Sequence, residues 1–249
     1  AKEILVTNVN EANASYYTSK ADTNASANLN PDNNASIENL MSGRFWGNLG
    51  SGIDLTYSFM DTDSKFSSHY NLTDATLQAN NVQNPSTVFK STVENALELF
   101  SSVSLLNFSE VEEVGNTVGH LRFGTTSAED GAFAWYPYGN WDAAGDIWFN
   151  SISDYFNNSV ALMDGTYWNQ TIVHEIGHAL GLSHTQDEES YGGTTYGSDS
   201  SFGGIHNANP YSTMAYPEYV GEPSDLAENM FSRPTTLMID DVAALQYLY

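Results

Sequence analysis

HEIGHALGLSH, residues 174–184, places three histidines and a glutamate at fixed offsets along the chain. On a helix, residues i and i+4 lie on one face, so His174 and His178 can direct their imidazoles at one point. Gly181 lets the chain leave the helix through a backbone conformation with positive φ, and the turn brings His184 round as a third ligand. Three neutral imidazoles with an open fourth position are typical of a catalytic zinc site.

Glu175 follows the first histidine directly, so its carboxylate projects beside the metal and is not a third ligand. There it can take a proton from a water molecule held by the metal. Structural zinc sites have four ligands, commonly cysteines, and this chain has no cysteine. Given this composition, chance would produce the five residues at these offsets in about 1.5 of 100,000 sequences. The segment predicts zinc-dependent hydrolysis; a metal site kept only for stability is the alternative, and it leaves Glu175 without a task.

The composition excludes several other classes of protein. The 249 residues include 31 Asp and Glu against 7 Lys and Arg, a formal net charge of -24. Binding to nucleic acid is excluded, because phosphate contacts need clustered Lys and Arg. The absence of cysteine excludes disulfide scaffolds, iron–sulfur clusters and thiol catalysis. No apolar run approaches the roughly 18–20 residues that span a bilayer, so membrane insertion is not expected.

An acidic, lysine-poor surface suits saline or extracellular conditions, because salt screens the self-repulsion. Solubility alone is an alternative explanation of this charge. The first six residues, AKEILV, are too short and wrongly flanked for a signal peptide. Either the signal has been removed or export uses another route, and we expect a secreted, extracellular monomer that acts on proteins or peptides.

Hydrophobic periodicity predicts an α+β domain, because strands and helices follow each other without strict alternation. A strand is expected at Ile53–Met60 and an amphipathic helix over about 86–104. Two further helices are expected over Thr171–Leu180 and Ile239–Tyr249, the second beginning with two aspartates that suit a helix N-terminus. Further strands are expected at Asn107–Val111, Val118–Phe123, Ala132–Trp135 and Asp146–Phe149.

Two polar segments carry no clear periodicity. Residues 7–40 predict a loosely packed arm with one helix near Ile37–Met41, and a disordered leader is the alternative. Residues 185–213 are rich in Gly, Ser, Tyr and Asp, and we interpret Gly192–Gly204 within them as a solvated loop. The remaining histidines, His69, His120 and His206, are expected to be surface or hydrogen-bonded polar residues and not metal ligands.

The pattern H-E-x-x-H-x-x-G-x-x-H resembles that of the metzincin metallopeptidases. Their second signature is a Met-turn, which holds a methionine beneath the metal, and YSTMAY at residues 211–216 resembles it. The resemblance assigns that structural methionine to Met214. In serralysins and astacins, the tyrosine two residues later is an additional zinc ligand in the resting enzyme, which implies the same role for Tyr216. A packed aromatic side chain without a catalytic role is the alternative for Tyr216.

Among metzincins, the chain looks like the protease domain of a serralysin from about Phe45 to Tyr249. The absence of cysteine argues against astacins, which usually carry disulfides. Serralysins usually have proline where this chain has Thr185. They also continue into glycine-rich calcium-binding repeats, and no such repeat occurs here, so this sequence does not support calcium as a cofactor. The matching segments are LTYSF at 55–59, HLRFG at 120–124, GAFAW at 131–135, GDIWFN at 145–150 and DDVAALQYLY at 240–249.

The resemblance implies one catalytic domain over residues 1–249, in two lobes on either side of a cleft. The N-terminal lobe, about 1–181, would hold a twisted mixed sheet and the active-site helix. The C-terminal lobe, about 182–249, would hold the third zinc ligand, the Met-turn and the last helix. Substrate would lie extended along the edge strand of the sheet, at Ala132, Phe133, Ala134 and Trp135, and add backbone hydrogen bonds to it.

The resulting function is that of a secreted zinc-dependent endopeptidase. Zinc polarises the scissile carbonyl and lowers the pKa of the attacking water, while Glu175 moves the proton to the leaving amine. As the water attacks, the phenol of Tyr216 would swing away from the metal and donate a hydrogen bond to the oxyanion. Two other hypotheses are a narrowly specific processing or toxin metalloprotease and a non-catalytic binding module stabilised by zinc.

Overall fold

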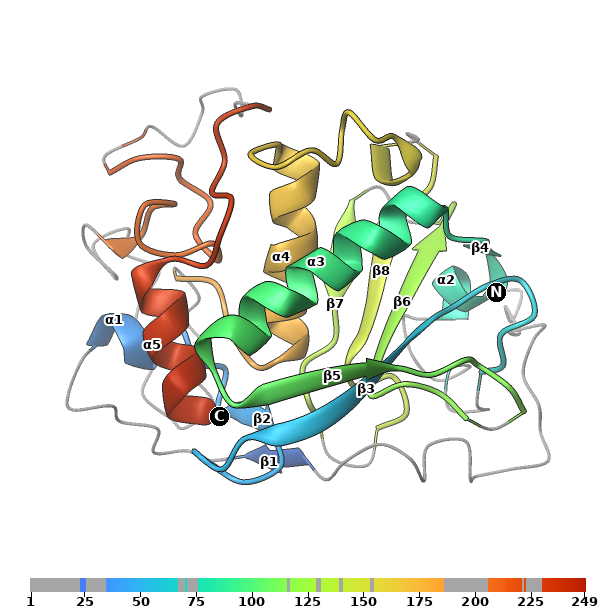
Figure 1. The fold of residues 1–249 in the computed structure, drawn as a ribbon, viewed down its shortest axis with the longest axis horizontal. Coiled ribbons are helices and arrows are strands. Elements are labelled where there is room, and N and C mark those ends of the chain that lie inside the picture. The colour runs from blue at the N-terminus through green and yellow to red at the C-terminus, as the bar shows by residue number, and fades with distance from the viewer. Residues whose placement is uncertain are drawn as a thin grey trace, which may run out of the picture.

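The computed structural model describes residues 23–25, 35–66, 70, 76–115, 117–128, 131–138, 141–152, 155–185, 206–220, 222 and 230–249. Within these ranges the chain forms a mixed six-stranded sheet, a two-stranded sheet and five α-helices (Figure 1). The predicted α+β architecture is therefore confirmed. Most of the N-terminal arm and the segment Gly192–Gly204 lie outside the described residues. No described helix has the length and apolar character that crossing a membrane requires.

The large sheet has the strand order β5-β3-β6-β8-β7, and β4 pairs with β6 off this path. Every pair along the order is parallel except the last, in which β7 runs antiparallel to β8. Strand β7 therefore forms one edge of the sheet. The strands are β3 (Ile53–Phe59), β4 (Val82–Gln83), β5 (Leu106–Glu110), β6 (Leu121–Thr126), β7 (Ala132–Ala134) and β8 (Asp146–Asn150).

Helix α3 (Thr87–Val103) confirms the helix expected over 86–104. It begins where the Ser86 side chain accepts a hydrogen bond from the Phe89 amide at 3.1 Å, which satisfies one of the free N–H groups of the first turn. Its apolar face, with Phe89, Val93 and Phe100 fully buried, joins one hydrophobic core with the sheet and α4. Burying each such side chain stabilises the fold by roughly 1.5–3 kcal/mol.

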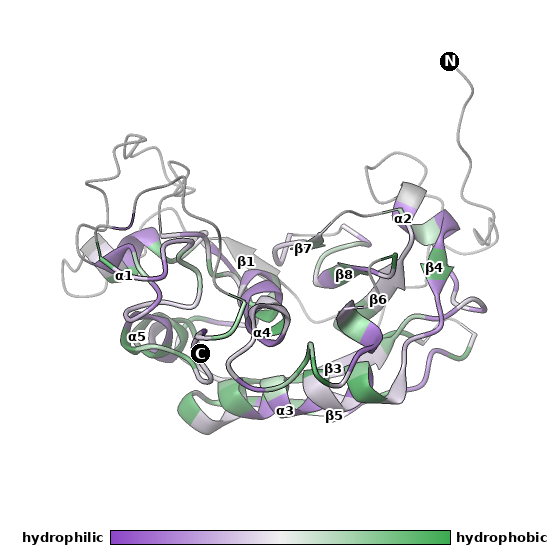
Figure 2. Cartoon of the chain, turned by 90° about the horizontal axis from the view of Figure 1, so that it is seen from above, coloured by the Kyte–Doolittle hydropathy of each residue, from purple (hydrophilic) through white to green (hydrophobic). Residues whose placement is uncertain are grey.

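Helix α4 (Tyr167–Ala179) begins four residues before the expected start at Thr171. The cap residue Thr166 explains the difference, because its hydroxyl accepts from the Asn169 amide at 3.2 Å and so starts the helix without apolar periodicity. The helix ends before Gly181, whose φ is +101°. A Cβ at this glycine would lie 2.0 Å from the Arg44 carbonyl oxygen, so the turn accepts no larger residue. Seen from above, α4 stands between α5 and the strands β7 and β8 (Figure 2).

Groups far away in the sequence hold the carbonyls that the end of α4 leaves unpaired. The Trp46 indole N–H donates to the Ala179 carbonyl at 2.9 Å, and the Tyr249 hydroxyl donates to that of Leu180 at 2.7 Å. The Ser42 amide donates to the Gly181 carbonyl at 2.9 Å. Burial also raises the pKa of Tyr249, so its hydroxyl stays protonated and available as a donor. The end of α4 is therefore fixed by residues near both ends of the described chain.

Helix α5 (Ile239–Leu248) lies where it was expected, and α1 is found two residues earlier than the helix predicted near Ile37–Met41. Several short elements were not predicted, because two to five residues are too few to show a period. Helix α1 spans Ala35–Asn39. The short elements that were not predicted outside the large sheet are β1 (Thr23–Ala25), β2 (Arg44–Trp46), α2 (Thr76–Asn80) and a 3-10 turn at Tyr155–Asn157.

We expect Tyr249→Phe to lower the stability of the protein by roughly 1–3 kcal/mol, because the buried Leu180 carbonyl and Trp46 amide both lose a hydrogen-bond partner. The measurement is denaturant unfolding followed by tryptophan fluorescence. Tyr247→Phe is the matched control in the same helix, because its partly buried ring packs against the core and no hydrogen bond of its hydroxyl is seen among the described residues. Equal stability of the two variants would show that the Tyr249 hydroxyl contributes nothing.

Candidate metal centre

The structure brings the three predicted histidines to one point. His174 and His178 lie one turn apart on α4, and His184 follows the turn at Gly181. Their Nε2 atoms form a triangle with sides of 3.1, 3.1 and 3.2 Å. Among the described residues, this is the one group of three or more His, Cys, Asp or Glu side chains that could hold a metal ion.

Backbone carbonyls orient two of these rings. The Nδ1 atom of His174 lies 2.9 Å from the Thr213 carbonyl oxygen, and that of His178 lies 2.7 Å from the Leu182 carbonyl oxygen. A carbonyl can only accept, so both Nδ1 atoms carry the proton and both Nε2 atoms present a lone pair to the centre. Histidines that bind a metal commonly donate their other ring N–H to a carbonyl oxygen in this way.

The electrostatics of the centre favour a neutral imidazole at His178. Burial lowers the pKa of His178 well below its usual value, and the neighbouring His174 and His184 lower it further. The hydrogen bond to the Leu182 carbonyl acts in the opposite direction but does not reverse the shift. A neutral imidazole is the form that coordinates a metal.

The donor set fits zinc. Nitrogen ligands 2.0–2.1 Å from a tetrahedral zinc ion are about 3.3–3.4 Å apart, and the Nε2 atoms here are separated by 3.1–3.2 Å. Lone pairs that point at one another repel unless a cation lies between them. Three imidazoles also leave the fourth position of a zinc ion open, as catalytic sites require.

Met214 lies directly against α4 at Gly177. It is fully buried, and its sulfur lies 2.6 Å from where a Cβ of Gly177 would be. Any side chain at Gly177 would therefore displace the methionine. The sequence assigned no role to Gly177, although a glycine inside a helix is a signal of close packing.

Tyr216 approaches the centre from its exposed side. Its hydroxyl lies 3.0 Å from the Nε2 atom of His184, and the two ring centroids are 4.7 Å apart. Its side chain is nevertheless exposed, with 62% of its surface accessible. The phenol can therefore reach the centre without being enclosed by it.

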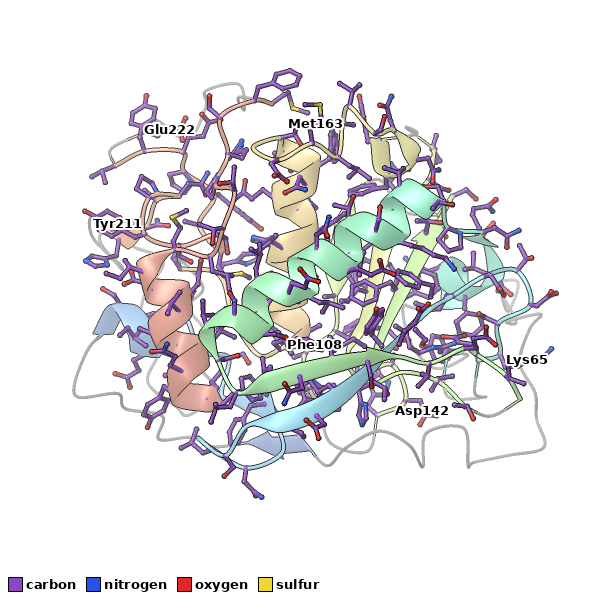
Figure 3. The ribbon with its side chains drawn as sticks, in the orientation of Figure 1. Lys65, Phe108, Asp142, Met163, Tyr211 and Glu222 are labelled. Carbon is purple, nitrogen blue, oxygen red and sulfur yellow. The ribbon has the colours of Figure 1, made fainter. Side chains whose placement is uncertain are left out.

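A buried aspartate from α5 holds the loop that carries Met214. Asp241 accepts hydrogen bonds from the Ser212 hydroxyl at 2.6 Å, the Thr213 amide at 2.8 Å and the Met238 amide at 2.9 Å. Burial raises the pKa of this carboxyl, and the hydrogen bonds oppose that shift. The sequence suggested only a helix start for this residue. Tyr211, in the same loop, lies beside the first turn of α5 (Figure 3), where its carbonyl accepts from the Asp240 amide.

The other candidate residues lie on α4 and on the edge strand. Glu175 is a buried carboxylate between the two helical ligands, 6% exposed. Of the four half-buried residues expected to contact substrate, strand β7 carries Ala132, Phe133 and Ala134, and Trp135 follows directly after its end. The chain then reaches the centre, because the Tyr136 ring meets that of His178 edge-on at 5.5 Å. Tyr136 was missed, since it stands one residue beyond the matching segment.

The other histidines do not join the centre. The Nδ1 atom of His120 lies 2.8 Å from the Thr56 amide, and that of His206 lies 2.6 Å from an Asp240 carboxylate oxygen. Both are hydrogen-bonded polar residues, as expected. His69 lies outside the described residues.

Two histidines on one helix and a third after its closing turn, in a mixed α+β domain, are typical of zinc metallopeptidases. The family model for matrixin, peptidase M10, matches residues 64–206, so the chain belongs to this family and is a serralysin-like metzincin protease domain. The metal of the centre is therefore zinc.

Curated relatives agree with this assignment. The chain is 30% identical over 201 residues to "Metallopeptidase AprA" of Pseudomonas marginalis, which covers 79% of this chain and 40% of the relative. It is 33% identical over 159 residues to "Metalloprotease AprA" of Pseudomonas entomophila, covering 62% and 32%. It is 29% identical over 211 residues to "Serralysin B" of Dickeya chrysanthemi, covering 81% and 40%. The chain thus spans less than half the length of these relatives.

We expect the purified protein to hold about one zinc ion per chain, because the three histidines form one metal site. His184→Asn should lose most of this zinc on dialysis against a weak chelator, because it removes one of three ligands. His206→Asn is the matched control and should keep it, since His206 pairs with Asp240 and not with the centre. Elemental analysis measures both; full zinc in the His184 variant would contradict the ligand assignment.

Proposed function

We propose that this chain is the single catalytic domain, residues 1–249, of a secreted, extracellular zinc endopeptidase that acts as a monomer on proteins or peptides. Its lobes would be about 1–181 and about 182–249. The observation that carries the proposal is the triangle of Nε2 atoms with Glu175 on the same helix and the Tyr216 hydroxyl beside His184. These groups together supply a metal site, a base and a hydrogen-bond donor.

Each group has a defined task in peptide hydrolysis. Zinc, when bound, polarises the scissile carbonyl and lowers the pKa of a water molecule. Glu175 takes the proton from the attacking water and delivers it to the leaving amine. Its burial favours this transfer, because a carboxylate shielded from bulk water interacts more strongly with the reacting atoms. The buried Met214 supports the ligand-bearing helix from below.

Tyr216 serves as a ligand in the resting enzyme and as a donor during turnover. When substrate enters, the phenol would turn away from His184 and its hydroxyl would donate a hydrogen bond to the developing oxyanion. The exposed position of the side chain supports this proposal, because the ring can rotate without disturbing the core. A donor aimed at developing charge contributes about 2.7–4 kcal/mol to catalysis.

Substrate lies along strand β7 and extends the sheet. β7 forms the sheet edge, its residues Ala132, Phe133 and Ala134 are half-buried, and Trp135 follows them toward the centre. An added peptide strand would pair with the backbone of β7 and bring its scissile bond toward His178, against which Tyr136 packs.

A protease of narrow specificity, used for processing or as a toxin, has the same centre and differs only in its subsites. A non-catalytic binding module that uses zinc only to stabilise its fold would not need Glu175 or the Tyr216 hydroxyl. Hydrolysis of casein, with and without a zinc chelator, separates this last hypothesis from the two enzymes. Loss of all hydrolysis on chelation and its return with zinc are expected.

Glu175→Gln should keep the zinc and the fold while kcat for peptide hydrolysis falls roughly 10²–10⁴-fold, the contribution of general base catalysis. The glutamine keeps the shape of the side chain but cannot accept the proton. Steady-state kinetics on a fluorogenic peptide, with elemental analysis of the same preparation, measures the effect. Activity above a tenth of wild type would refute the role of Glu175 as base.

Tyr216→Phe keeps the ring and removes only the hydroxyl. We expect kcat to fall about 10²–10³-fold, because the oxyanion loses one donor, while KM and thermal stability change little. Tyr219→Phe is the matched control, since Tyr219 is an exposed tyrosine of the same segment. An unchanged kcat in the Tyr216 variant would mean that this tyrosine merely packs.

A further inference from the structure

The position of Tyr216 is set by its backbone. With 62% of its surface exposed, the side chain has too little packing to hold itself in place. The two carbonyls on either side of it both face Asn209. The Asn209 amide N–H donates to the Pro217 carbonyl at 2.8 Å. One side-chain amide atom of Asn209 lies 2.9 Å from the Ala215 carbonyl oxygen.

The orientation of the Asn209 side chain follows from its neighbours. Its other amide atom lies 2.9 Å from Nη1 of Arg233. A guanidinium has only donors, so the atom that faces it is the amide oxygen. The nitrogen therefore points to the Ala215 carbonyl. It also lies 3.1 Å from the side-chain amide of Gln170, which must then present its oxygen to Asn209. Asn209 is 3% exposed, so water cannot replace either bond easily.

Arg233 closes the network on the far side of Tyr216. Its Nη2 atom lies 3.0 Å from a carboxylate oxygen of Glu218, two residues beyond the tyrosine. The guanidinium lies over the ring of Tyr167 in the first turn of α4, 5.2 Å from its centroid. The Arg233 amide donates to the Gly165 carbonyl at 3.0 Å. The planar guanidinium of Arg233 thus connects the Tyr216 segment to the start of α4, the helix that carries His174 and His178.

We propose that Asn209 and Arg233 are positioning residues, which hold the backbone at Ala215–Glu218 so that the Tyr216 phenol can alternate between the metal and the oxyanion. The inference rests on the proposed role of Tyr216. Arg233 does not serve as a charge that attracts substrate, because it is 6% exposed and Glu218 neutralises it. Its function is to keep Asn209 and Glu218 at fixed distances on either side of the tyrosine.

Asn209→Asp tests the bond to Ala215 with almost no change of shape. One carboxylate oxygen still accepts from Arg233, while the other repels the Ala215 carbonyl and can accept from the Gln170 side-chain amide instead. We expect kcat to fall roughly ten- to hundredfold, as for a misplaced catalytic group, with KM within about twofold of wild type. Zinc content should not change. Asn158→Asp is the matched control, because the side-chain oxygen of Asn158 accepts hydrogen bonds from the Val160 and Ala161 amides in another loop, as a carboxylate also can.

A double-mutant cycle shows whether Asn209 acts through Tyr216. In the Tyr216→Phe background, Asn209→Asp should change kcat by less than about twofold, because the hydroxyl that it positions is absent. Equal losses in both backgrounds overturn the inference and leave the role of Tyr216 intact. A wild-type kcat in Tyr216→Phe overturns the role of Tyr216, and with it the inference.

Hydrogen exchange supplies a readout apart from activity. The amides of residues 211–219 should exchange faster in Asn209→Asp, whereas those of α4 keep their protection; unchanged exchange and unchanged kcat overturn the inference.

Should Asn209→Asp fail to fold, Arg233→Lys makes the same test, because a lysine can pair with Glu218 but cannot bridge to Asn209 as well. It should lower kcat in the Tyr216 background only, and a wild-type kcat overturns the role of Arg233.

Discussion

Three imidazole nitrogens held 3.1–3.2 Å apart are the constraint on which the rest of this structure depends. The Nε2 lone pairs of His174 and His178 repel each other, so the protein must hold these rings in place. Part of that work is done by the carbonyls of Thr213 and Leu182, each on a different segment from the ring that it holds. The loop around Met214 and the turn at Gly181 must consequently be as well ordered as α4 itself.

That order comes from parts of the chain that contribute no ligand. Trp46 and Tyr249 satisfy the carbonyls at the end of α4, and Asp241 fixes the loop that supplies the Thr213 carbonyl. All three are buried, where a lost hydrogen bond costs more than at the surface. The metal centre and the hydrophobic core are therefore stabilised by the same contacts, so a substitution in the last helix can weaken both.

The sequence predicted the parts of the centre that depend on local spacing. His174, His178 and His184 lie within one helix and one turn, and their offsets determine their geometry. Arg233 and Asn209 could not be found in this way. Their contact depends on how two loops pack on α4, which the spacing of residues in the sequence does not predict. The long helices and central strands showed clear periods, whereas a strand as short as Arg44–Trp46 is formed by its tertiary contacts.

Exposure separates the groups of the centre by whether they must move. Glu175 is 6% exposed and His178 is 7% exposed, and neither needs to change position while a peptide bond is cleaved. Tyr216, which in our proposal changes partner during each turnover, is the exposed member. A mobile phenol is useful only if it returns to the same place. The buried hydrogen-bond network around its backbone fixes that place and leaves the ring free to rotate. The polar residues beneath Tyr216 thus solve a problem that a purely apolar core could not, because only hydrogen bonds fix the direction of a peptide unit.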